Sequence, residues 1–68
     1  MSRYDYEISK EISAQDPPFA ALIFAALRKA DTQNYHRLEQ AFPALVEEFR
    51  TRYNAPGGYL PHEPHEFD

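Results

Sequence analysis

Nine consecutive apolar residues, FAALIFAAL at positions 19–27, stand out in a chain of 68 residues. Two prolines precede this segment, and the cations Arg28 and Lys29 follow it. Proline is favoured in the first turn of a helix and cations are favoured in the last turn. The pattern therefore predicts a helix over about 18–30.

A second apolar stripe extends over residues 32–54, with spacings of three and four residues that are typical of a helix. Its members are Tyr35, Leu38, Phe42, Leu45, Phe49 and Tyr53. Asp31 precedes it as a candidate N-cap. Pro43 lies within the stripe and removes a backbone hydrogen bond, so we expect a kink or break near Pro43, or a helix that restarts there. Because the connection is short, 18–30 and 32–54 are predicted to form an antiparallel helical hairpin.

The two ends of the chain are less regular. Residues 1–16 fit either a short helix with Tyr4, Ile8 and Ile12 aligned or an extended strand, and the helix is favoured because a lone strand has no sheet to join. The end of the chain, YLPHEPHEFD, is acidic and contains two prolines, which predicts an irregular tail. The predicted fold class is all-α, with one small helical domain over 1–60 and a flexible acidic tail over 61–68.

The charge and composition disfavour several classes of function. The net charge is −4, and the seven lysines and arginines are scattered, whereas a nucleic-acid binder normally has a basic patch. A nucleic-acid-associated regulator that uses Arg28, Lys29 and Arg37 at the hairpin bend is therefore only an alternative. The chain has no cysteine, which fits a reducing cytoplasm. It has no secretory signal pattern, and its apolar segment is too short to span a membrane, so we expect a cytoplasmic protein.

Few residues have the spacing of a catalytic or metal site. His62 and His65 are weak candidates for a metal because they are three residues apart, with Pro64 between them opposing a helix. The adjacent Glu47 and Glu48 point to different faces of a helix and cannot act as a pair on one bond. We therefore expect neither a cofactor nor an enzymatic activity.

The apolar segment has more apolar surface than one neighbouring helix can cover. Phe24 lies at the flank of its main face, either as the margin of a wide core or as the anchor of a second contact face with Ala21, Ala25 and Arg28. Together with Tyr35 and Arg37, these four residues are the candidate partner-binding residues. The surplus predicts self-association into a symmetric dimer with a four-helix arrangement, although another protein could cover the same surface.

Two stretches, DPPFAALIFAALRKADTQN and AFPALVEEFRTRYNAPGGYLP, resemble a type of short protein from bacterial and bacteriophage genomes to which no activity is assigned. The resemblance implies a bacterial cytoplasm or a mobile element as the setting, and it assigns no functional residue. The function expected from the sequence is a small non-enzymatic protein-interaction module, such as a regulator, adaptor or inhibitor of a cellular protein.

Overall fold

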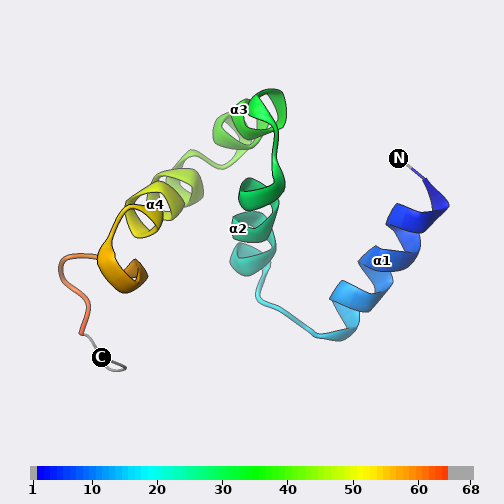
Figure 1. Ribbon diagram of the computed structural model, residues 1–68, viewed down its shortest axis with the longest axis horizontal. Coiled ribbons are helices and arrows are strands. Elements are labelled where there is room, and N and C mark those ends of the chain that lie inside the picture. Colours follow the sequence, from blue (N-terminus) through cyan, green and yellow to red (C-terminus); the bar gives the residue numbers. More distant parts are fainter. Residues whose placement is uncertain (1, 65–68) are drawn as a thin grey trace.

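The computed structural model describes residues 2–64, and all regular structure in this part of the chain is helical (Figure 1). This confirms the predicted all-α class. Four α-helices are followed by one short 3₁₀ turn. Their bounds are α1 Arg3–Ala14, α2 Phe19–Lys29, α3 Thr32–Ala41, α4 Pro43–Tyr53 and η1 Pro56–Gly58.

The core lies between α2 and α4. Its buried members are Ile23 and Leu27 from α2 and Val46 and Phe49 from α4, and Val46 is completely buried. Partly buried side chains from all three helices after α1 pack around these four residues, including Leu38 of α3. All members of the long apolar stripe except Tyr53, which is 65% exposed, therefore lie on the core side of α3 and α4.

The aromatic contacts between α2 and α4 follow the same order along both helices. Near the start of each helix, the ring of Phe19 lies 5.8 Å from the ring of Phe42. Further along, the ring of Phe24 lies 5.7 Å from that of Phe49. The first residues of α4 thus contact the first residues of α2.

This order is explained by a complete break in the predicted second helix. Phe42 has φ −135° and ψ 62°, which ends α3, and Pro43 is the first residue of α4. A residue before proline is disfavoured in helical geometry, and proline lacks the N–H that a continuous helix would need. The predicted restart at Pro43 is confirmed. Helix α3 returns the chain toward the start of α2. Residues 18–54 therefore form three helices and not the predicted two-helix hairpin.

Local hydrogen bonds set the helix starts that the sequence predicts. The backbone N–H of Asp5 donates to Ser2 Oγ and that of Ser2 donates to Asp5 Oδ2, both at 3.2 Å, which forms a capping box at α1. The N–H of Asn34 donates to Asp31 Oδ1 at 2.8 Å. The helix alternative for residues 1–16 and the Asp31 cap are therefore confirmed.

Helix α1 stands apart from the other helices and has no buried residue (Figure 1). The connection to α2 contains Asp16, whose φ of 52° lies in the left-handed region. Aspartate tolerates this region better than most residues, and the following Pro17 disfavours the right-handed alternative. Pro18 is extended and is the N-cap of α2, so the helix begins at Phe19, one residue later than the sequence predicts. These residues direct α1 away from the core.

The chain after α4 folds back and is anchored by an arginine. Gly57 and Gly58 have φ values of 67° and 74°, which reverse the backbone direction. Arg52 then donates two hydrogen bonds of 2.7 Å to the two carboxylate oxygens of Glu63, and its Nε donates to Glu48 at 2.9 Å. The sequence predicts a flexible tail from residue 61, but Glu63 in that tail is bound by Arg52. Residues 65–68 of the predicted tail lie outside the described residues.

The anchor changes the protonation of both partners. The side-chain hydrogen bonds from Arg52, with a further one from the Leu60 amide, lower the pKa of Glu63 from its ordinary value of 4.5 to about 2. The same contact with Glu63, followed by that with Glu48, raises the pKa of Arg52 above its ordinary value. The pair is therefore fully charged at neutral pH.

We expect the stabilising contribution of the anchor to be fully present above pH 4.5 and to be lost as the pH falls through about 2. Between these two pH values Glu63 is ionised in the folded chain but protonated in the unfolded chain. Nuclear magnetic resonance titration of the Glu63 carboxyl carbon checks this. In an Arg52→Gln variant the midpoint should rise toward the ordinary value, and in an Arg37→Gln control it should stay low. A wild-type midpoint near 4.5 would contradict the ion pair.

Candidate interaction surface

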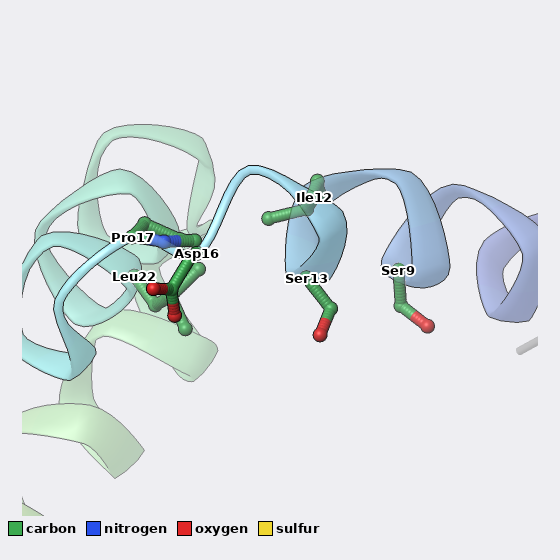
Figure 2. A pocket seen from close by; sticks show the side chains of 6 residues that line it. All are labelled: Ser9, Ile12, Ser13, Asp16, Pro17 and Leu22. Carbon is green, nitrogen blue, oxygen red and sulfur yellow. The ribbon is translucent and has the colours of Figure 1, made fainter.

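A cleft lies between α1 and the start of α2, with a volume of about 310 Å³. Figure 2 shows Ile12 extending from α1 toward Asp16, Pro17 and Leu22 on the other side. We call this the α1–α2 cleft. Its lining residues are Ser9, Ile12, Ser13, Asp16, Pro17 and Leu22.

Large apolar side chains are exposed on both walls of this cleft and next to it. On α1, Tyr4 is 71% exposed and Ile12 is 42% exposed, and both lie on one side of the helix because they are eight residues apart. On α2, Phe19 is 60% exposed and Leu22 is 37% exposed. Exposed large apolar side chains that meet at a cleft, as Ile12 and Leu22 do, are typical of a surface that another molecule covers.

The side of α2 that faces away from the core is apolar over most of its length. Leu22, Ala25, Ala26 and Lys29 fall on one side of the helix, and all four are exposed. We call these four residues the outer face of α2. Lys29, at the end of the helix, is the only charged residue on this face.

Two opposite charges lie at the two ends of α2. The carboxylate of Asp16 lines the α1–α2 cleft before the first turn, and Lys29 ends the helix. Among the interactions of residues 2–64, neither side chain has an ion-pair partner. Two free charges of opposite sign therefore flank one exposed apolar helix face.

The predicted contact face on α2 is divided between the surface and the interior of the fold. Ala21 and Ala25 are exposed, but Phe24 is half-buried and packs on Phe49. The guanidinium of Arg28 lies 5.6 Å from the ring of Phe49 and 5.5 Å from the ring of Tyr53. Of the two alternatives for Phe24, the margin of the core agrees with the structure.

The remaining predicted contact residues lie on α3. Tyr35 is half-buried against the core cluster, and it lines a small cavity beside Arg28 and Arg50. Arg37 is exposed and its Nη1 donates to the side chain of Asn34 at 3.3 Å. Since Arg28 and Arg37 both have partners within the fold, Lys29 is the least engaged member of the proposed cation cluster.

No group of three potential metal ligands forms among the described residues. His62 is exposed, and His65 lies outside the part of the chain that the structure describes. His36 lies near Gln40 and Glu39 on the surface of α3. His36 and Glu39 also line an open cavity of about 400 Å³ with Asp31, Thr32 and Tyr35 at the start of α3.

The described helices are all too short or too polar to cross a membrane. This agrees with the length argument made for the apolar segment.

Sequence reasoning missed the α1–α2 cleft and the role of Asp16 in it. The alignment of Tyr4, Ile8 and Ile12 was a usable signal, because an amphipathic helix that does not pack on its own chain leaves this stripe exposed. The direction of α1 depends on the backbone of Asp16, which no periodic pattern encodes. Comparisons with protein-family models, with curated proteins and with solved structures give no match for this chain.

Proposed function

We propose that the chain is a small, non-enzymatic protein-interaction module that binds through the α1–α2 cleft and the outer face of α2. The observation that carries this proposal is the exposure of Ile12 and Leu22 on the two walls of one cleft, with Tyr4 and Phe19 exposed on the same two helices. Burial of such side chains is the main favourable contribution in protein association. The lack of cysteine fits a reducing cytoplasm as its setting, and the resemblance to bacterial and bacteriophage proteins agrees with it.

A binding role also agrees with the distribution of polar groups. The acidic net charge weighs against a nucleic-acid partner, and so do the contacts of Arg28 with the Phe49 ring and of Arg37 with the Asn34 side chain. The titratable groups with shifted pKa values, Arg52 and Glu63, form the tail anchor and line no part of the cleft. Their shifts are explained by a structural ion pair.

Site-specific photo-crosslinking tests this function. A photoreactive phenylalanine derivative replaces Leu22 on the outer face, and in a matched control it replaces Glu47, which is exposed on α4. In cells that make the chain, we expect a discrete protein adduct from position 22 and none above background from position 47. Equal labelling at the two positions, or no adduct at position 22, would contradict the proposal.

A further inference from the structure

We infer that the occupant of this surface is a second copy of the same chain, bound through an antiparallel contact between the two α2 helices. The inference rests on the function proposed above and names the partner of that surface. In a two-fold symmetric contact each residue meets the same surface on the other copy, so the surface must be complementary to itself. The outer face of α2 meets this requirement in both charge and shape.

Charge complementarity is the first argument. Asp16 lies before the start of α2 and Lys29 lies at its end, and neither is paired within residues 2–64. When two α2 helices lie antiparallel, the start of each is beside the end of the other. Each Asp16 then faces Lys29 of the second copy, which gives two ion pairs across the contact. A parallel arrangement would bring like charges together instead, which is unfavourable.

Side-chain size is the second argument. Leu22 projects from the outer face, and Ala25 and Ala26 leave space on the same face one turn later. A two-fold axis between residues 23 and 24 of α2 places each Leu22 opposite Ala25 of the second copy, and each Lys29 beside Pro18, two residues from Asp16. Close approach of helices is favoured where a large side chain on one helix meets small side chains on the other.

The position of α1 supplies the remaining area. Stable interfaces bury at least about 1,000 Å² in total, which two 11-residue helices supply only with help from their neighbours. The α1–α2 cleft includes Leu22 of the outer face of α2, and Ile12 lines it from α1. The end of the second copy's α2 enters this cleft and is covered by α1. The exposed apolar side chains of α1 are thereby buried.

Charge exchange between two variants tests the inference. In Lys29→Asp, two aspartates face each other at both ends of the contact, and in Asp16→Lys, two lysines do so. By sedimentation equilibrium, we expect the wild-type chain to dimerise and each variant alone to associate at least about tenfold more weakly. An equimolar mixture of the two variants should regain dimers, because each introduced charge then meets its opposite. Glu47→Lys, which reverses an exposed charge on α4, is the matched control and should dimerise as the wild type does.

Each outcome has a distinct meaning. Circular dichroism of every variant checks that the helices are retained, and recovery in the mixture excludes misfolding as the cause of weak association. Failure of the mixture to associate would overturn the antiparallel contact. A wild-type chain that stays monomeric at every concentration up to about 1 mM would overturn the second copy as occupant. In that case an adduct of position 22 with a different protein would still support the proposed function, so the two proposals can fail separately.

Discussion

Replacing Phe49 by alanine is expected to unfold the α2–α4 unit. Phe49 is 8% exposed, and its ring contacts Phe24 on α2 and Tyr53 on α4 while Arg28 lies over it. Truncation of a buried phenylalanine to alanine costs about 3–5 kcal/mol. A core of this size supplies roughly 3–5 kcal/mol in total, so the loss is comparable with the whole stability of the domain.

Urea unfolding followed by circular dichroism measures this effect. The matched control is Tyr4→Ala, because Tyr4 is an aromatic residue on α1 that is 71% exposed. In dilute solution, where the chain is monomeric, we expect the control to leave the midpoint of the α2–α4 transition unchanged. A Phe49→Ala chain with a wild-type midpoint would mean that the core does not lie where α2 meets α4.

Two leucines on the same helix are expected to respond very differently to the same substitution. Leu27 is 4% exposed and belongs to the core, whereas Leu22 is 37% exposed on the outer face. Leu27→Ala should lower the free energy of unfolding by about 2–5 kcal/mol. Leu22→Ala should change it by less than about 0.5 kcal/mol when both are measured in dilute solution, where the chain is monomeric.

The comparison also assigns a role to each side of α2. At high concentration Leu22→Ala should weaken association, while its effect on the dilute monomer stays small. Equal destabilisation by both substitutions in dilute solution would show that the outer face is packed within the monomer. Chemical denaturation at two protein concentrations separates these cases.

The helical elements could be predicted because their signals are local. Ser2 and Asp5 at α1, Asp31 at α3 and Pro43 at α4 act within one turn of their own helix, so the sequence contains the full interaction. The core was predicted less completely. The stripe included Leu45, which is half-buried, and omitted Val46, which is fully buried, although Val46 lies one turn from Phe42 on the core side.

The arrangement of the helices depends on features that no periodic pattern records. The break at Phe42 divides the predicted helix 32–54 into α3 and α4. As a result, the chain at the start of α4 contacts the start of α2, through Phe42 and Phe19. The anchor between Arg52 and Glu63 joins residues 11 apart through a reversal at two glycines, so neither residue alone indicates the other. The candidate surface arises from the backbone direction at Asp16, which places the apolar stripe of α1 beside the outer face of α2.

The separation of α1 from the core means that this helix can unfold while the core between α2 and α4 stays intact. No residue of α1 is buried, so it is held by local contacts such as its capping box, the ion pairs of Glu7 with Arg3 and Lys10, and the contact of Lys10 with the Tyr6 ring. An isolated helix of 12 residues is marginal in water, since helices shorter than about 12–15 residues gain too few hydrogen bonds to offset nucleation. The hydrogen bonds of α1 therefore break and re-form by local unfolding while the core around Val46 stays folded. A partner that covers this helix must use part of its binding free energy to hold the helix in one conformation.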